Sequence, residues 1–252
     1  MPRFVPLLKG ASGPLGRELQ RELAARGYPV TVDGVFGSQT LRGVRAFQSQ
    51  NLDPTGQPLV IDGKVGPLTW WSLHHPKPRI DLSSAVDFTR VPVSGGSRPG
   101  RVALSAAAEE ITAGAGEVGG NNQGSYVRKY LHGLAPQGSS WCAGFVSWCF
   151  SQGPAGIPFP YTVGARALLG EFKRRGWAAA PGSGYAPAPG DIVVWWRERL
   201  EGWLGHIGLV HQVRDGILYT VEGNHSPRVQ GFSYVLSRME KLLGYGHVPD
   251  PS

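Results

Sequence analysis

The stretch G-S-S-W-C-A-G-F-V-S-W-C-F, residues 138–150, contains both cysteines of the chain, Cys142 and Cys149. Its apolar side chains recur three and four positions apart, a spacing typical of a helix with one face in a core. On one helix, seven residues at about 1.5 Å per residue separate the two cysteines by roughly 10 Å. A disulfide needs Cα atoms within about 7 Å, which excludes a bond between them on one helix.

The two cysteines have different predicted environments. A zinc site needs further ligands and usually a C-x-x-C pair, which the sequence lacks. Cys149 fits a buried core position. Cys142 follows Pro136, Gly138 and two serines, a pattern typical of a helix start, so we expect it in the first helical turn. There the helix dipole favours a thiolate, and a nearby histidine would make Cys142 a candidate nucleophile.

A histidine with carboxylate and amide neighbours follows later in the chain. His206 opens the run G-H-I-G-L-V-H-Q-V, which reads as a strand and follows the strand-like P-G-D-I-V-V-W-W. Glu222 and Asn224 lie two positions apart in V-E-G-N-H-S, so we expect them on one strand face. Either side chain can accept a hydrogen bond from an imidazole and hold its tautomer. The sequence leaves this third role open between them.

The composition predicts a chain with a real core and many turns. Hydrophobic residues make up 41% of the 252 residues, charged residues 17%, and there are 37 Gly and 21 Pro. The net charge of +7 favours a polyanionic partner, but no basic run or nucleic-acid motif is present, so we expect no nucleic-acid partner. No apolar run approaches ~18 residues, so we expect no membrane insertion. The first ten residues lack the features of a secretory signal.

An internal repeat marks the N-terminal part of the chain. Residues 33–40 and 62–69 share the pattern D-G-x-x-G-x-x-T, with the second copy 29 residues after the first. In each copy Asp-Gly predicts a tight turn, and a helix with Thr in its first turn follows. Leu15, Leu19 and Leu23 predict a further helix on i, i+4 spacing. These signals predict a compact three-helix unit.

The order of elements predicts the fold class and domains. A helical segment A-L-S-A-A-A-E-E-I and the cysteine stretch precede several strand-like runs, an order typical of α+β proteins. Residues 76–100 show no periodicity and end in Gly, Ser and Pro, which is typical of a linker. We therefore expect an all-α domain at 1–75, a linker at 76–100 and an α+β domain with an antiparallel sheet at 101–252.

The N-terminal unit resembles a known family of binding domains. Residues 7–73 are similar to the small three-helix peptidoglycan-binding domain of wall hydrolases through L-G-R-E-L-Q-R-E-L-A-A-R-G-Y, D-G-V-F-G, V-R-A-F-Q and D-G-K-V-G-P-L-T-W. The loop D-P-T-G-Q-P, residues 53–58, departs from the pattern by lengthening the link between the two repeats. The resemblance implies a shallow groove for wall fragments, with Asp33, Phe36 and Trp70 as candidate contacts.

The second domain resembles the CHAP family of cysteine peptidoglycan amidohydrolases, related to NlpC/P60. The similarity covers about 105–250 and is carried by S-S-W-C-A-G-F-V-S-W-C-F, P-G-D-I-V-V-W-W, G-H-I-G-L-V, V-E-G-N-H-S and L-G-Y-G. It implies a papain-like α+β fold. Some relatives bind calcium through an acidic loop, but this sequence has no D-x-D-x-D run, so we expect no metal and no cofactor. The implied catalytic residues are Cys142 as nucleophile, His206 as base, and Glu222 with Asn224; candidate substrate contacts are Trp141, Asn122 and Trp196.

Together the two resemblances imply a phage endolysin-like peptidoglycan hydrolase. An endopeptidase acting on the stem peptide or cross-bridge is the favoured reading, and an N-acetylmuramoyl-L-alanine amidase with the same residues is the alternative. A non-catalytic wall-binding protein and a transglutaminase-like acyl transferase remain as readings of other classes. We expect a monomer that reaches the wall through a holin or a secretion apparatus, in the latter case with an immunity protein.

Overall fold

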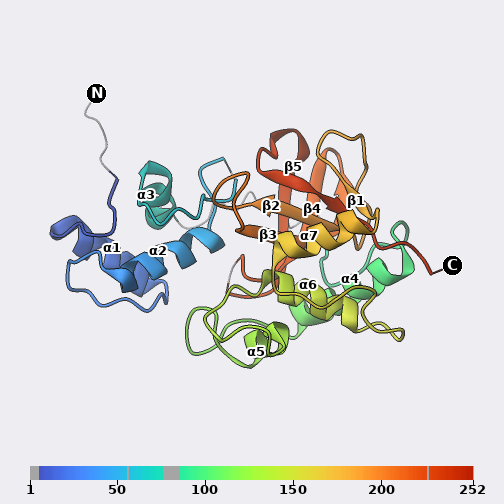
Figure 1. Cartoon of the computed structure of the whole chain (residues 1–252), viewed down its shortest axis with the longest axis horizontal. Helices are drawn as coiled ribbons and strands as arrows, with labels where there is room; N and C mark the ends of the chain where they lie inside the picture. Colours follow the sequence, from blue (N-terminus) through green and yellow to red (C-terminus); the bar gives the residue numbers. More distant parts are fainter. Residues whose placement is uncertain (1–5, 56, 76–85, 226, 252) are drawn as a thin grey trace.

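The structure, a computed structural model, describes residues 6–55, 57–75, 86–225 and 227–251. A small module of helices lies beside a larger one built from helices and an antiparallel sheet (Figure 1). This arrangement confirms the predicted α+β class and the helical N-terminal region. None of the helices in these ranges is long and apolar enough to cross a membrane.

The N-terminal module has three helices around one core. They are α1 (Pro14–Ala25), α2 (Ser38–Gln50) and α3 (Pro67–His74). Proline opens α1 and α3, where its fixed φ suits the first turn and its missing N–H costs no helical hydrogen bond. The core side chains include Leu19, Leu23, Phe36, Val44, Phe47, Val65 and Leu73.

A buried glutamine explains the first copy of the repeat. The side-chain amide of Gln20, on α1, donates to Asp33 Oδ1 at 2.7 Å, Val35 O at 3.0 Å and Thr40 Oγ1 at 3.1 Å. Its Oε1 accepts from the N–H of Gly34 at 2.6 Å. The Asp-Gly turn and the following Thr therefore enclose one side chain of the preceding helix.

Gln48, on α2, does the same for the second copy. It donates to Asp62 Oδ1 at 3.0 Å, Lys64 O at 2.9 Å and Thr69 Oγ1 at 3.2 Å, and accepts from Gly63 N at 2.8 Å. In each copy of D-G-x-x-G-x-x-T, the Asp, the first Gly and the Thr are therefore hydrogen-bond partners of one buried glutamine amide. Helix α1 supplies the glutamine for the first copy and helix α2 supplies it for the second.

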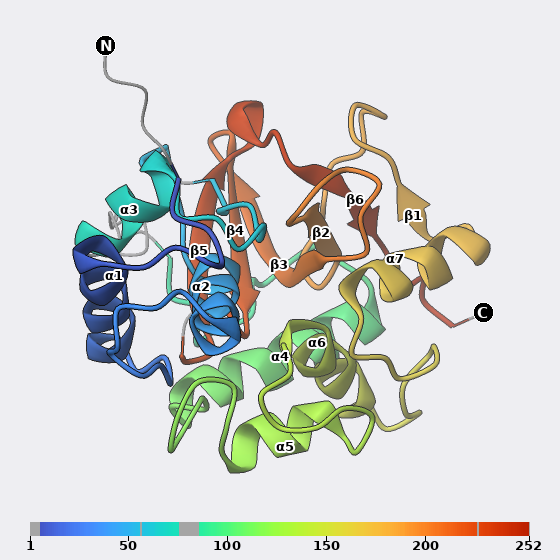
Figure 2. The same cartoon turned by 60° about the vertical axis from the view of Figure 1, so that its left-hand side comes forward.

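The larger module stacks helices against a six-stranded sheet with strand order β1-β6-β2-β3-β4-β5, all pairs antiparallel. Helices α4, α5 and α6 gather on one side of this sheet (Figure 2). The main core lies between these layers, and a second cluster that includes Val193, Trp195 and Tyr234 also forms in this module. The elements are α4 (Arg98–Thr112), α5 (Ser125–Leu131), α6 (Cys142–Ser151), α7 (Ala165–Arg174), β1 (Ala178–Ala179), β2 (Ile192–Trp196), β3 (Gly205–Arg214), β4 (Ile217–Glu222), β5 (Gln230–Val235), the 3-10 turn η2 (Leu236–Arg238) and β6 (Leu242–Gly246).

The predicted linker at 76–100 is too long at its C-terminal end. Helix α4 already begins at Arg98, after Ser97, whose side chain caps it by accepting from the N–H of Gly100. Val86 and Phe88 are buried in the main core of the larger module. Isolated apolar residues of this kind give no periodicity, which is why the sequence indicated a linker. Residues 76–85 lie outside the described residues.

The two modules are in direct contact. The N–H of Ile61, in the N-terminal module, donates to the carbonyl of Arg197 at 2.5 Å. The side chain of Gln50, at the end of α2, donates to Glu117 Oε1 at 3.0 Å. The C-terminal end of α2 therefore lies against the larger module, close to the start of α6, whose neighbour Trp141 also bonds Glu117.

We predict that Gln20→Ala lowers the stability of the N-terminal module by about 1–3 kcal/mol, since it leaves buried partners of the amide unsatisfied. Hydrogen-exchange mass spectrometry of peptides from α1 and α2 measures this opening free energy. Gln39→Ala is the matched control, because Gln39 is exposed and, among the described residues, its side chain accepts from Thr31 alone. Equal effects of the two substitutions would contradict the role assigned to Gln20.

Candidate active site

Cys142 is the first residue of α6, which confirms its predicted place in the first turn of a helix. Its side chain is 4% exposed. Gly144 lets α6 pack closely against α5, since a Cβ there would lie 2.3 Å from the carbonyl oxygen of Tyr130. Cys149 is fully buried in the core and, like Cys142, is a free cysteine.

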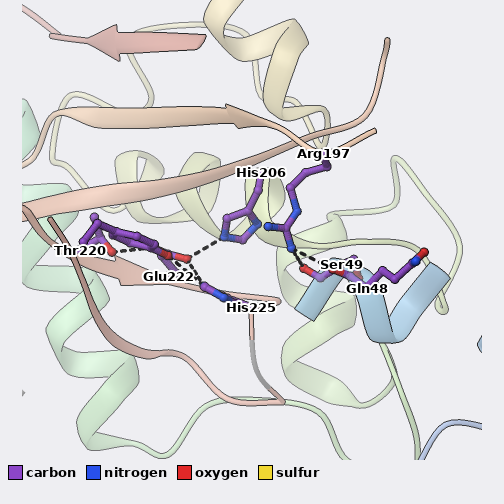
Figure 3. Close-up of polar contacts among 8 residues, drawn as sticks. Gln48, Ser49, Arg197, His206, Thr220, Glu222 and His225 are labelled. Atoms are coloured by element: carbon purple, nitrogen blue, oxygen red, sulfur yellow. Dashed lines mark hydrogen bonds and ion pairs between the residues drawn. The ribbon is translucent and has the colours of Figure 1, made fainter. Parts of the chain in front are cut away.

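His206 is the second residue of β3, opposite Trp195 of β2. The two rings stack with centroids 5.9 Å apart, which restrains the imidazole. Its Nε2 lies 2.7 Å from Glu222 Oε2 (Figure 3). The other ring nitrogen, Nδ1, is therefore the one available for the side-chain hydrogen bond with Cys142.

The carboxylate of Glu222 is fully enclosed by polar side chains. Glu222 ends β4 and is fully buried. Its Oε2 contacts His206 and also His225 Nδ1 at 2.5 Å. Its Oε1 accepts from Thr220 Oγ1 at 2.5 Å and from the hydroxyl of Tyr234 at 2.8 Å. Each carboxylate oxygen thus has two partners, which fixes the carboxylate and, through it, the ring of His206.

The charges of the three side chains support one another. Burial alone would raise the pKa of Glu222, but the charge of His225 and the hydrogen bond from His206 outweigh it and hold this pKa well below its usual range. Burial would lower the pKa of His206, yet its hydrogen bonds with Cys142 and Glu222 raise it. Burial would raise the pKa of Cys142, and His206 lowers it instead. The geometry therefore favours a thiolate–imidazolium pair.

Sequence reasoning missed two residues of this group. The first is His225, whose ring contacts the carboxylate of Glu222 as His206 does. Both residues stand in the motif V-E-G-N-H-S, but the motif gave no sign of this contact. Gly208 leaves room for Glu222, since a Cβ at this position would lie 2.6 Å from Glu222 Cγ. The signal was available as H-x-G: residues two apart on a strand share a face, so Gly208 lies on the same face as His206.

Asn224 differs from the sequence prediction. Strand β4 ends at Glu222, so the two residues do not share a strand face. Asn224 has φ 61°, a left-handed conformation that asparagine tolerates better than most residues. Its Oδ1 accepts from the N–H of Trp141 at 3.0 Å, and its Nδ2 donates to Asn122 Oδ1 at 2.7 Å. Asn224 therefore fixes the start of α6, whereas Glu222 contacts His206.

Three residues of the larger module that we expected to contact the substrate do not line the cleft described below. Trp141 is fully buried, stacks on Tyr130 at 5.3 Å and donates from Nε1 to Glu117, so it is a core residue. Asn122 is buried, and its side chain bonds Asn224 and Gly138. Trp196 is half-buried beside the ammonium of Lys241. Asn122 and Trp141 are therefore buried residues that bond Asn224, and neither lines the cleft.

The expected ligand contacts of the N-terminal module are also revised. Phe36 is fully buried in the helical core and cannot face a ligand. Trp70 is half-buried and stacks on His74 with centroids 5.2 Å apart. Asp33 is exposed, and hydrogen bonds from the N–H of Val35 and from Gln20 lower its pKa. Among the three, Asp33 lines a surface hollow.

A cleft of about 320 Å³ gives access to the cysteine and histidine. Its volume is in the range of small-ligand sites, ~300–1,000 Å³. Trp203, which is 79% exposed, is on its rim. Both modules form its walls: Ser49 and Ile61 come from the N-terminal module, and Cys142, Arg197, Trp203, His206 and Asn224 from the larger one.

Among the described residues, His206, Glu222 and His225 are also the group that could hold a metal ion, with ligand atoms within 4.8 Å of one another. These same atoms already bond each other in two contacts to Glu222 Oε2. The carboxylate of Glu222 therefore contacts both imidazole rings directly. In this arrangement His206 also keeps its hydrogen bond with the side chain of Cys142.

A cysteine at a helix start, with a histidine and a buried glutamate on neighbouring strands, is an arrangement that can support nucleophilic catalysis. Residues 135–224 match the family model of the CHAP domain, and residues 12–73 match that of the "Putative peptidoglycan binding domain". These matches confirm both resemblances seen in the motifs. Together they support a peptidoglycan hydrolase.

The chain is also similar to a solved structure titled "Crystal structure of Burkholderia AP3 phage endolysin". The match has 32% sequence identity and a TM-score of 0.25, and it covers 46% of this chain and 41% of that one. The chain therefore matches less than half of that protein's length. No curated protein gave a significant match.

We predict that iodoacetamide alkylates Cys142 at a pH well below the value of about 8.5 typical of a free cysteine. The thiolate is the reactive form, and His206 lowers the pKa of Cys142, so the rate rises with pH through this lowered pKa. Cys149 is the internal control, because burial raises its pKa and keeps it a thiol. A rate that rises only near the pH of an ordinary thiol would contradict the ion pair.

Glu222→Gln and Asn224→Ala should separate the two candidate roles. Without its carboxylate partner His206 loses charge stabilisation, so we expect Glu222→Gln to move the alkylation midpoint of Cys142 upward by about 1–3 pH units. Asn224→Ala should change the maximal rate through the start of α6 and leave the midpoint in place. The opposite pattern in the midpoints would assign the orienting role to Asn224.

Proposed function

We propose that the protein is a cysteine peptidoglycan endopeptidase that hydrolyses an amide bond in the stem peptide or cross-bridge. The observation that carries this proposal is the group formed by Cys142, His206 and Glu222 at the foot of a cleft. The match to a peptidoglycan-binding family in residues 12–73 supports the polymer as substrate. The net charge of +7 suits an anionic wall.

In the first chemical step the Cys142 thiolate attacks the carbonyl carbon of the scissile amide. The negative charge moves to the carbonyl oxygen of a tetrahedral intermediate. The N–H of Cys142 belongs to the first turn of α6, where backbone donors have no acceptor within the helix, and it stabilises this oxyanion. His206 Nδ1 then gives its proton to the leaving amine as the C–N bond breaks.

The second step releases the acyl group. A thioester now links the substrate carbonyl to Cys142, and His206 is neutral. His206 takes a proton from water and becomes an imidazolium again, while the hydroxide attacks the thioester carbonyl. The C–S bond then breaks, which releases the acid product and leaves the Cys142 thiolate. Glu222 stays ionised throughout and holds the ring of His206 in the tautomer that keeps Nδ1 toward Cys142.

The same steps would serve an N-acetylmuramoyl-L-alanine amidase, which differs only in the bond placed over Cys142. In either case the protein acts on the wall after release through a holin or delivery by a secretion apparatus. The bond cleaved therefore has to be read from the products.

We predict that purified sacculi treated with the protein yield new free N-termini inside the stem or cross-bridge, identified by mass spectrometry. Cys142→Ala should abolish these products, with a loss of at least about 10³-fold in rate. Cys149→Ala is the matched control and should keep the chemistry, since Cys149 is buried in the core away from the cleft.

Two results would overturn parts of this proposal. Glycan strands freed of intact stems, with new L-Ala N-termini, would make the enzyme an amidase. Products that are the same with the wild-type protein and Cys142→Ala would remove the catalytic role of Cys142 altogether.

A further inference from the structure

Arg197 is a fully buried arginine on the wall of the cleft. It directly follows β2 and lies beside His206 (Figure 3). Its Nη2 donates to the carbonyl oxygens of Gln48, at 3.3 Å, and Ser49. These carbonyls belong to the last turn of α2, where the helix dipole favours a cation. The N-terminal module therefore holds one edge of the guanidinium.

The rest of the guanidinium is unsatisfied. Nε and Nη1 are buried and have no hydrogen-bond partner in the part of the chain that the structure describes. Burial lowers the pKa of Arg197 to about 10, so the side chain is still a cation at neutral pH. A buried donor without an acceptor destabilises the folded protein, the more so on a charged group. Among the described residues, these two donors of the cation therefore have no acceptor.

The anions of the site do not fill this gap. The charge of Glu222 acts on Arg197 and raises its pKa, but the two oxygens of Glu222 already serve His206, His225, Thr220 and Tyr234. The side chain of Cys142 is already paired with the ring of His206, which lowers the pKa of the thiol. A ligand that enters the cleft is left as the source of the missing acceptor and negative charge.

We propose that Arg197 binds a free carboxylate of the peptide substrate, next to the amide bond over Cys142. This inference rests on the proposed function and adds a substrate determinant to it. Stem peptides carry free carboxylates, and a guanidinium pairs with a carboxylate through charge-assisted hydrogen bonds. Because α2 holds Nη2, docking of the N-terminal module sets the orientation of this subsite.

Arg166 provides a contrast within the same region. It lies beside Gly205 of the cleft wall, and all three of its nitrogens donate to loop carbonyls. Nε bonds Leu204 O at 2.9 Å, Nη1 bonds Leu200 O at 2.9 Å, and Nη2 bonds Arg199 O at 3.0 Å. Its donors are used within the protein, so Arg166 makes a matched control for an arginine whose donors are not.

The test compares two purified muropeptides that differ at one group, the carboxylate next to the cleaved bond, which is free in one and amidated in the other. We expect the full-length protein to prefer the free carboxylate by about tenfold or more in kcat/KM, since hydrogen bonds to charged groups are the strong ones. In Arg197→Gln this ratio should fall to about one, whatever absolute rate remains. In Arg166→Gln the wild-type ratio should persist.

Calorimetric binding of the same two muropeptides to Cys142→Ala protein separates this inference from the proposed function. Preference for the free carboxylate in binding, with no cleavage of either peptide by the wild-type protein, would overturn the function and keep the subsite. Cleavage of both forms at equal kcat/KM by the wild-type protein would overturn the subsite and keep the function. The wild-type comparison decides this even if Arg197→Gln fails to fold.

Discussion

The buried carboxylate of Glu222 is the constraint on which the rest of the site depends. A carboxylate removed from water must be fully hydrogen-bonded, and four side chains from β3, β4, β5 and the turn after β4 converge to do this. One of them is His206, whose ring is thereby turned so that its other nitrogen meets Cys142. Glu222 thereby holds His206, at the start of β3, toward Cys142 at the start of α6. Because Gly208 has no side chain, the side chain of Glu222 fits against its backbone.

The N-terminal module also contributes to the surroundings of Cys142, because it contacts the larger module and lines part of the cleft. Gln50, the last residue of α2, bonds Glu117, and Glu117 in turn receives the indole N–H of Trp141, next to the nucleophile. Ser49 and Ile61 form part of the cleft wall. The cleft that leads to Cys142 is therefore lined by both modules. Arg197 lies at their junction, where its side chain donates to the last turn of α2.

Local signals in the sequence predicted much of this structure. The Pro/Gly/Ser run before Cys142 indicated a helix start, Gly205 before His206 indicated a strand start, and the D-G-x-x-G-x-x-T repeats indicated paired turns. Burial was harder to predict. Trp141 and Phe36 look like ligand-binding aromatics in sequence, but contacts with residues far along the chain enclose both. The bond between Arg197 and Ser49 joins residues 148 positions apart, and no local pattern encodes it.

The charge states of Cys142 and His206 should depend on each other, and NMR titration of His206 in the wild-type protein and in Cys142→Ala tests this dependence. The hydrogen bond and charge of Cys142 raise the pKa of His206 against the effect of burial, so removing the thiol should lower that pKa. We expect the wild-type ring to stay protonated to a higher pH than the ring in the variant. Titration of His206 at the same pH in both proteins would contradict it.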